Sequence, residues 1–425
     1  MDAEILTIGT ELVLGFTVNG NAAVMGSMLA GAGVRVRRTA SVVDEPELIA
    51  EAVKAALERC GTVIISGGLG PTRDDMTRES VARVFGTKLN RDPAIVERLR
   101  DWYKGRGVLN MPEANLVQAD VPEGATVLEN ALGTAPGLWI ESNGHLAVLL
   151  PGVPKELKAL MESQVIPRLQ ERVSAGAPTP GAPRTVIRSR TLRSTGIGES
   201  AIADILGDYQ KQIGEKVSLA FLPSTAGTDL RFTVWDLPEG EASGALEHAG
   251  SWLLSTKIGT RIYGEGNTDI AAVVLDKLAA EEATLSVAES CTGGLLGARL
   301  TAIPGSSMVF VGGVVAYEND IKLQLLGVSA DDLTTHGAVS EEVARQMASG
   351  VRRATDSDAA IAITGIAGPD GGSADKPVGT VWIAISWRDA ERAFHLQLPG
   401  DRQDVRERAA QYALDYLRRI LAGTV

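Results

Sequence analysis

The first 66 residues alternate short apolar runs with stretches of helical periodicity, and this alternation constrains the fold most. Strands are expected at 5–8, 34–43 and 62–66, with helices at 21–32 and 45–59. Strands that are separated by helices run parallel, because the chain crosses back over one face of the sheet between them. The pattern predicts an α/β fold class, with a parallel sheet that has helices on both faces.

A segment without large apolar side chains divides the chain after this first domain. Residues 174–183 contain only small residues, threonine and proline, so they are expected to form a linker. A small α+β (KH-like) pattern follows, and a third α/β unit begins near Gly266. The 425 residues are enough for three domains, which we expect at 1–172, 184–263 and 266–425.

The charge distribution bears on the choice of partners. The middle segment has a shape that also occurs in RNA-binding domains, but its nine Lys and Arg are balanced by nine Asp and Glu. It also lacks a Gly-x-x-Gly clamp between its helices, which favours a spacer or dimerisation scaffold. The net charge of −12 argues against binding to nucleic-acid backbones or anionic membranes. No nucleic-acid partner is therefore expected.

Cysteine usage and hydropathy point to the compartment. The two cysteines, Cys60 and Cys291, are far apart and do not have the spacing of metal ligands. A reducing compartment is the simplest context, so we expect a cytoplasmic protein. The chain begins without a basic segment followed by an apolar one, and no stretch approaches 18 apolar residues. Neither secretion nor membrane spanning is predicted.

A glycine-rich turn with two carboxylates follows the strand at 62–66. Backbone N–H groups of Gly67, Gly68 and Gly70 can approach an anion closely, and a helix is expected to open there. The glycine spacing fits neither a Walker loop nor the dinucleotide fingerprint. Carboxylates beside a phosphate site usually hold a hard divalent cation, so Asp74 and Asp75 strengthen the prediction.

This segment resembles the molybdopterin-binding fold shared by molybdenum-cofactor biosynthesis proteins and the amino-terminal domain of the CinA family, over roughly residues 3–170. The resemblance implies a three-layer α/β domain with a pyrophosphatase site for ADP-ribose, dependent on a divalent metal (Mg, Mn or Co). It places Asp44 and Asp75 at the metal, and adds Glu11, Asn21 and Asn115 to the site. Asp44 could instead cap the following helix, and Asn19 and Asn21 could form only a turn and a helix cap.

Four polar, glycine-rich segments follow apolar strands in the third unit, at 288–294, 304–307, 317–322 and 364–372. In the first segment, the hydroxyls of Ser290 and Thr292 and the amides of Gly293 and Gly294 are expected to bind phosphate or ribose. Thr292 could also simply cap the next helix. Cys291 has no nearby histidine to activate it, and we interpret it as structural.

The segment at 304–307 supplies a candidate nucleophile. A serine needs a base, and with no histidine in these motifs the candidate is Lys322, 15 residues beyond Ser307. Such a pair works only if burial or nearby positive charge lowers the pKa of the ammonium group enough to give a neutral amine. Ser306 and Ser307 could instead only end a helix, and Lys322 could be an ordinary solvated lysine.

The four segments together resemble the carboxy-terminal domain of the CinA family, a nicotinamide mononucleotide (NMN) deamidase that uses a Ser–Lys dyad without a metal. The resemblance implies catalytic roles for Ser307, Lys322, Tyr317 and Thr364, and substrate contacts for Gly365 and Arg402. Gly365, next to Thr364, could supply an oxyanion amide. Tyr317 could instead only pack at a strand end, and Arg402 could pair with Asp401 or Asp404.

The two resemblances together imply a bifunctional enzyme that recycles pyridine nucleotides, and we expect it to be a homodimer. Its small-molecule partners would be NMN and ADP-ribose, both of which are fragments of NAD. Two alternatives keep the same folds: a nucleotide-binding scaffold in competence or the response to DNA damage, and a pterin-binding protein.

Overall fold

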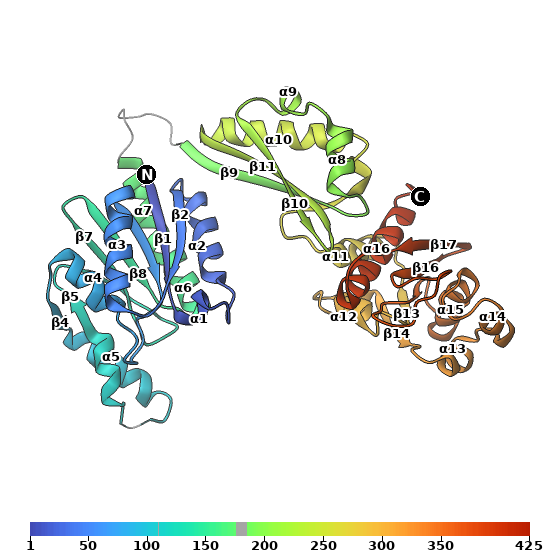
Figure 1. Cartoon of the computed structure of the whole chain (residues 1–425), viewed down its shortest axis with the longest axis horizontal. Helices are drawn as coiled ribbons and strands as arrows, with labels where there is room; N and C mark the ends of the chain where they lie inside the picture. The colour runs from blue at the N-terminus through green and yellow to red at the C-terminus, as the bar shows by residue number, and fades with distance from the viewer. Residues whose placement is uncertain (109, 176–184) are drawn as a thin grey trace. The chain divides into compact units, whose positions relative to one another are not determined.

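The computed structural model of the protein describes residues 1–108, 110–175 and 185–425, so most of the expected linker at 174–183 lies outside the described residues. The chain forms two compact units, one of residues 1–188 with 234–244 and the other of residues 189–233 with 245–425 (Figure 1). Among the described residues, no helix combines the length and the apolar character that crossing a bilayer requires.

The amino-terminal unit is built on a six-stranded sheet. Its order is β2 (Arg35–Val42), β1 (Asp2–Ile8), β3 (Thr62–Ser66), β8 (His145–Leu150), β7 (Gly137–Ser142) and β6 (Thr126–Leu128). The first four strands are parallel, but β7 runs antiparallel to both of its neighbours, β8 and β6. The sheet is therefore mixed, and not wholly parallel as expected. The turn residues Asn143 and Gly144 both have positive φ, which is typical of a tight hairpin and reverses the chain between β7 and β8.

Helices cover both faces of this sheet, which gives a three-layer α/β/α arrangement. One apolar core lies under α3 (Pro46–Cys60), α4 (Thr77–Phe85) and α5 (Pro93–Lys104), and the other under α2 (Gly20–Gly31), α6 (Pro154–Leu160) and α7 (Ile166–Ala175). Successive side chains of a strand point to opposite faces, so Leu6 and Ile8 of β1 enter the first core and Ile5 the second. The remaining elements are short: α1 (Thr10–Val13), β4 (Leu89–Arg91), β5 (Asp120–Pro122), a 3₁₀ helix at Glu113–Ala119 and a π-helical turn at Met161–Val165.

The middle segment forms a four-stranded sheet in the order β10 (Val217–Ser224), β11 (Gly227–Pro238), β9 (Thr185–Ser194) and β12 (Ile262–Glu265). Its helices are α8 (Glu199–Leu206), α9 (Gln210–Ile213) and α10 (Glu239–Ser255), with a short turn at Gly259–Arg261. The apolar pattern of this segment predicts a single helix over 199–212. The chain leaves the helical conformation at Gly207, where φ is +52°, and so divides that helix in two.

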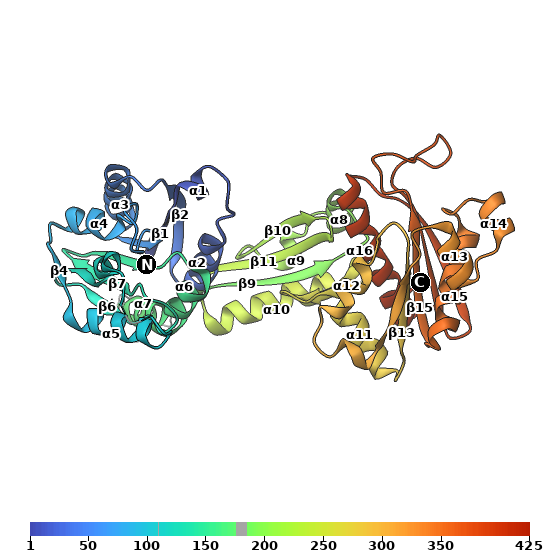
Figure 2. The ribbon, with the colours of Figure 1, turned by 90° about the horizontal axis from the view of Figure 1, so that it is seen from below.

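The last 160 residues form a second α/β/α sandwich on a five-stranded sheet. Its order is β14 (Phe310–Val315), β13 (Leu285–Glu289), β15 (Ala359–Gly365), β16 (Thr380–Trp387) and β17 (Ala390–Gln397). Figure 2 shows α11 (Ile270–Ala280), α12 (Leu295–Thr301) and α16 (Arg402–Leu421) on one side of the strands. On the other side are α13 (Asn319–Leu326), α14 (Ala330–Thr335) and α15 (Glu341–Thr355).

The parallel register of β14, β13 and β15 decides where the functional segments emerge. Glu289, at the end of β13, is level with Val315 of β14 and Ile363 of β15. Residues 290–294, 316–322 and 364–372 therefore leave the sheet side by side at its carboxyl edge. This is the edge at which open α/β sheets usually bind their ligands.

Gly67, directly after β3, offers a test of this packing. Its φ is +104°, and a Cβ atom added there would lie 2.2 Å from the carbonyl oxygen of Ile8 on β1. We expect Gly67→Ala to lower the free energy of unfolding of the amino-terminal unit by about 3 kcal/mol, because strand backbone cannot move aside. Denaturant unfolding followed by circular dichroism would measure this loss.

Gly124→Ala is the matched control. Gly124 also has a positive φ, +83°, but a Cβ atom there would meet nothing within 4 Å. That substitution should cost only about 1 kcal/mol of backbone strain. Equal losses in the two variants would show that the contact with Ile8 is unimportant.

Two candidate active sites

A cavity of about 420 Å³ lies at the carboxyl ends of β1, β3 and β8 in the amino-terminal unit. Most of the residues predicted for this site line it, namely Glu11, Asp44, Gly67, Gly68, Gly70, Asp74 and Asp75. Gln118 and Glu156 line it as well, although the sequence did not single out their side chains. The cavity therefore combines a glycine-rich turn with several carboxylates.

The two predicted asparagines lie beside this cavity. Asn21 lines an adjoining cavity of about 210 Å³ that shares Glu11 and Gly67 with the first. Its Nδ2 donates to Ser66 Oγ and to the Gly152 carbonyl, while its Oδ1 is buried without a partner. Asn115 is buried and donates from Nδ2 to Gln118 Oε1, 3.3 Å away, so it supports a residue of the cavity wall.

Asp44 and Asp75 are each fixed through one carboxylate oxygen. Asp44 Oδ2 accepts hydrogen bonds from Thr10 N and Oγ1, at 2.7 and 2.9 Å. Asp44 does not cap α3, whose cap residue is Glu45. Asp75 Oδ2 accepts from Thr72 N at 2.8 Å and from Thr72 Oγ1. In both carboxylates, Oδ1 has no hydrogen bond within the described part of the chain and is available to a ligand.

The two carboxylates suit a divalent cation that is bound partly by the protein and partly by the phosphates of a substrate. Within residues 1–108, 110–175 and 185–425, no three His, Cys, Asp or Glu side chains gather as a ready metal centre. Mg²⁺ in phosphate-processing sites is commonly held by one or two carboxylates, water and the phosphates themselves. Asp44 and Asp75, which line the same cavity, can supply such a pair.

The glycine-rich turn is supported both by a buried arginine and by the start of a helix, as expected. Helix α4 begins at Thr77, which donates from N to the Gly68 carbonyl at 3.2 Å and from Oγ1 to the Gly67 carbonyl at 2.9 Å. Arg78 donates to the carbonyls of Leu69 and Gly70, at 2.6 and 3.0 Å. Burial lowers the pKa of Arg78, although nearby Asp75 opposes the shift. A guanidinium group therefore supplies positive charge next to the cavity.

In the second sandwich, Arg402 links two of the predicted segments at the carboxyl edge. Its Nη2 donates to Tyr317 Oη at 2.7 Å, and its Nη1 donates to the Gly368 carbonyl at 2.6 Å. Arg402 does not pair with Asp401 or Asp404, which form the capping box of α16. Tyr317 is half exposed, so its hydroxyl can face a substrate.

Lys322 is a buried amine at the same edge. It is only 1% exposed, and its Nζ donates to the carbonyls of Ala316 and Tyr317, at 2.7 and 3.0 Å. Burial lowers its pKa, with partial opposition from Glu318. A neutral amine has two N–H groups, so these two hydrogen bonds use both and leave the lone pair free. Lys322 is therefore not the solvated lysine that the sequence left open.

Ser307 does not meet Lys322 within one chain. It is exposed in a short helical turn, Ser306–Met308, that precedes β14, whereas Lys322 follows the strand. The six residues of β14 alone span about 20 Å. The predicted dyad is thus divided between opposite ends of one strand, which the separation of 15 residues did not reveal.

The amides expected to bind phosphate are already occupied. Gly294 N donates to Glu289 Oε2 at 3.0 Å, and Gly293 N to the Ser290 carbonyl at 3.0 Å. The carboxylate of Glu289 also accepts from the amides of Leu296 and Gly297. A buried glutamate therefore takes the anion's place at the start of α12. The expectation of a backbone phosphate cradle here has to be corrected.

Arginines offer the alternative anion site. Arg406 lies one helical turn after Arg402 and donates from Nη2 to the Thr292 carbonyl at 2.9 Å. The Thr292 hydroxyl is buried without a partner, so it does not cap α12. Ser290 lies beside it and is nearly buried. The sequence contains a signal for this pair, because Arg402 and Arg406 are four residues apart in a helix and therefore lie on the same face.

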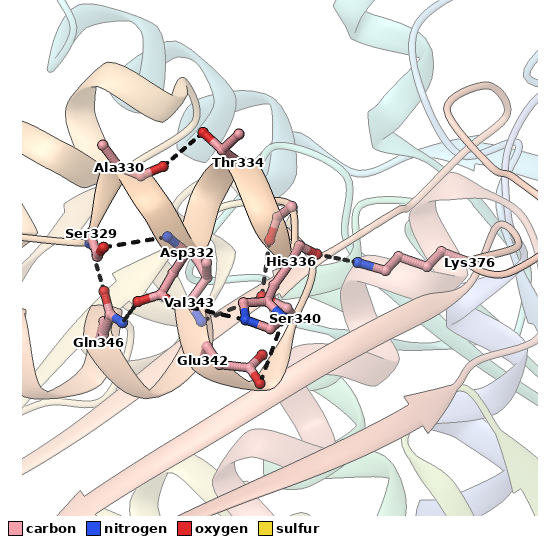
Figure 3. Close-up of polar contacts among 11 residues, drawn as sticks. Ser329, Ala330, Asp332, Thr334, His336, Ser340, Glu342, Val343, Gln346 and Lys376 are labelled. Atoms are coloured by element: carbon pink, nitrogen blue, oxygen red, sulfur yellow. Dashed lines mark hydrogen bonds and ion pairs between the residues drawn. The ribbon is translucent and has the colours of Figure 1, made fainter.

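Thr364 and Gly365 end β15 at this edge. Thr364 is fully buried and donates to the Ala338 carbonyl at 2.7 Å, while Gly365 is so close to Cys291 that an added Cβ atom would lie 3.1 Å from its sulfur. Lys376 ties the following loop to the same turn by donating to the carbonyl of His336 (Figure 3). It also donates to the carbonyl of Val339. Thr364 thus joins the end of β15 to the turn at Ala338.

Comparison with known proteins shows what this chain is similar to. The family model described as "CinA C-terminal domain" matches residues 267–421, "Probable molybdopterin binding domain" matches 4–171, and "Damage-inducible protein CinA KH domain" matches 189–264. A "CinA-like protein" of Gemmatimonas aurantiaca is 50% identical over 99% of this chain and 97% of its own length. A "Putative competence-damage inducible protein" of Caldicellulosiruptor saccharolyticus is 40% identical over 99% of both chains.

Solved structures resemble parts of the chain. The crystal structure of "the protein CinA with unknown function" from Thermoplasma acidophilum is 39% identical and covers 39% of this chain and 95% of its own, with a TM-score of 0.36. A competence/damage inducible protein from Agrobacterium tumefaciens is 41% identical and covers 36% of this chain and 93% of its own, with a TM-score of 0.35.

The state of Cys291 can be tested directly. Burial raises the pKa of its thiol to about 12, so almost no thiolate exists at pH 8. Cys60 is only partly buried. Native protein treated with iodoacetamide at pH 8 should therefore be modified at Cys60 well before Cys291, as peptide mass spectrometry would show. Faster labelling of Cys291 would indicate an activated nucleophile, and urea-unfolded protein should lose the difference.

Proposed function

Because the chain belongs to the CinA family, we propose that it is a bifunctional hydrolase, which deamidates NMN in its last domain and hydrolyses the pyrophosphate of ADP-ribose in its first. One observation carries the deamidase proposal. Lys322 is a buried amine with a lowered pKa and a free lone pair, at the edge where Tyr317 and Arg402 meet. A general base of this kind is what a serine nucleophile without histidine requires.

The proposed reaction proceeds in two steps. Lys322 removes the proton from Ser307 Oγ, and the oxygen attacks the carboxamide carbon of the pyridinium ring. The C–N bond then breaks, and ammonia leaves with the proton carried by Lys322. A water molecule, deprotonated by the same amine, cleaves the resulting ester and releases nicotinate mononucleotide. The main-chain carbonyl of Tyr317 accepts from Lys322, and its hydroxyl, which accepts from Arg402, can orient the leaving nitrogen.

The substrate phosphate is assigned to the arginine pair. Arg402 and Arg406 extend from the first turns of α16, and Arg406 contacts the Thr292 carbonyl. Two guanidinium groups can bind a phosphate with several charge-assisted hydrogen bonds. The unpaired hydroxyl of Thr292, together with Ser290, completes a polar wall. The proposed deamidation reaction requires no metal ion.

The amino-terminal cavity suits a diphosphate. Asp44 and Asp75 each present an oxygen to a divalent cation, which would neutralise phosphate charge and activate water when bound. Arg78 adds positive charge beneath the glycine-rich turn. The adjoining smaller cavity, with Asn21 in its wall, has room for part of the nucleoside. The carboxylates, the guanidinium and the glycine-rich turn together support pyrophosphate hydrolysis.

Substitution of the proposed dyad tests the deamidase. Ser307→Ala should lower the rate of ammonia release from NMN by about a thousandfold or more, since it removes the atom that forms the ester. Lys322→Arg should be nearly as damaging, because guanidinium keeps the charge but cannot act as a base. Ser306→Ala is the matched control and should retain most activity. Full activity in Ser307→Ala would contradict this assignment and make Ser290 the candidate nucleophile.

The pH profile should report the same amine. Lys322 is active when neutral, so kcat/KM should rise with pH, with a midpoint below the value of about 10.4 for a free lysine because burial lowers its pKa. Kinetics between pH 6 and 10 would measure the midpoint. A rate that falls over this range would contradict the role of Lys322 as a base.

Asp75→Asn tests the other site. The change keeps the size of the side chain but removes the negative charge that a divalent cation needs. We expect metal-dependent hydrolysis of ADP-ribose to fall at least a hundredfold while NMN deamidation is unchanged. Glu45→Gln, next to Asp44 but outside the cavity lining, is the control. If Asp75→Asn left ADP-ribose turnover intact, the proposed metal role would be wrong.

A further inference from the structure

The two groups of the proposed dyad lie at opposite ends of a strand that has a free edge. Ser307 precedes β14 and Lys322 follows it, about 20 Å away along the strand. Among the described residues, β14 pairs only with β13 and so forms one edge of the five-stranded sheet. Its outer N–H and C=O groups are left without a strand partner. The separation of the dyad and the open edge have a common explanation.

The composition of β14 is unusual for an edge. Natural edge strands are commonly protected by a charged residue, a proline or a β-bulge. Phe310-Val-Gly-Gly-Val-Val315 contains no charged residue and no proline, although its register against β13 shifts at Val311. A Cβ atom added to Gly312 would meet nothing within 4 Å, so a second backbone could approach there. Val311 and Val315 are each 51% exposed. The strand is suited to pairing with another strand.

Exposed apolar side chains also lie at both ends of β14. Met308, two residues before β14, is 82% exposed, and the ring of Tyr317, two residues after it, belongs to a side chain that is 53% exposed. Such side chains would be covered if the amino end of one β14 met the carboxyl end of another. An antiparallel pair of identical strands does this, because a twofold axis places each end beside its opposite.

We propose that β14 pairs antiparallel with β14 of a second copy, and that each deamidase site takes Ser307 from one copy and Lys322 from the other. With the twofold axis at Gly312, Ser307 lies five residues before the axis and Tyr317 five residues after it. Ser307 then faces Tyr317 of the second copy, whose carbonyl holds the amine of Lys322. This inference rests on the proposed function and assigns the part of it that one chain leaves incomplete.

Heterodimers test the shared site. Ser307→Ala and Lys322→Arg chains with different affinity tags are co-expressed at full length, and mixed dimers are isolated through both tags. Each homodimer should be inactive on NMN. The mixed dimer has one site with both native groups, so it should recover about half the activity of the parent dimer. A mixed dimer as inactive as its parents would overturn the proposal, because it would show that both groups act within one chain.

A second measurement does not depend on activity. Val311→Cys places a thiol near the proposed axis, and a short bismaleimide should join two such chains into a covalent dimer. The parent chain and Leu254→Cys, which adds an exposed thiol on α10, should give far less. Absence of the covalent dimer would overturn the strand pairing even in an active enzyme. Efficient cross-linking of a protein that does not deamidate NMN would support the pairing and reject the proposed function.

Discussion

The parallel register of β14, β13 and β15 is the constraint on which the carboxy-terminal site depends. Three strands that end level with one another bring three polar segments to one edge without any long loop. Main-chain carbonyls then hold two of the side chains: Lys322 donates to the carbonyls of 316 and 317, directly after β14, and Thr364 donates to that of Ala338. The strands therefore set where these side chains lie, and hydrogen bonds to the main chain hold them there.

Electrostatic balance within the fold decides where an anion can bind. Glu289 is buried at the start of α12 and occupies amides that would otherwise attract a phosphate. Positive charge is supplied instead by Arg402 and Arg406, whose long side chains reach the edge from α16. In the amino-terminal unit, Arg78 places positive charge beside the carbonyl groups of the glycine-rich turn.

Much of the fold could be predicted from the sequence, because strands and helices have distinct apolar periodicities. The expected strand at 62–66 agrees with β3, and the mixed α/β architecture with a molybdopterin-binding-like first domain is confirmed. The antiparallel strand β7 was missed, although Asn143-Gly144, which joins it to β8, is a hairpin signal. Gly207 likewise divided a helix that periodicity alone had joined.

The sites were less accessible to sequence reasoning, for physical reasons. Motifs identify the residue types that a reaction needs, but the direction of the strand between Ser307 and Lys322 decides whether they meet. Glycines next to a helix start suggest an anion site, but a glutamate one turn earlier can occupy the same amides. Arg78 and Arg406 lay outside the recognised motifs, and only tertiary contacts show their importance.

The uncharged edge strand β14 also affects how the chain behaves during synthesis. Until another strand covers it, Phe310–Val315 offers a row of unpaired backbone groups, with neither charge nor proline to prevent the wrong partner from adding. Any extended apolar peptide can compete for that edge, including the same segment of an unfolded chain. Overproduction or heat stress should therefore promote aggregation through this strand. The same uncharged edge that permits pairing with the correct strand also permits pairing with a wrong one.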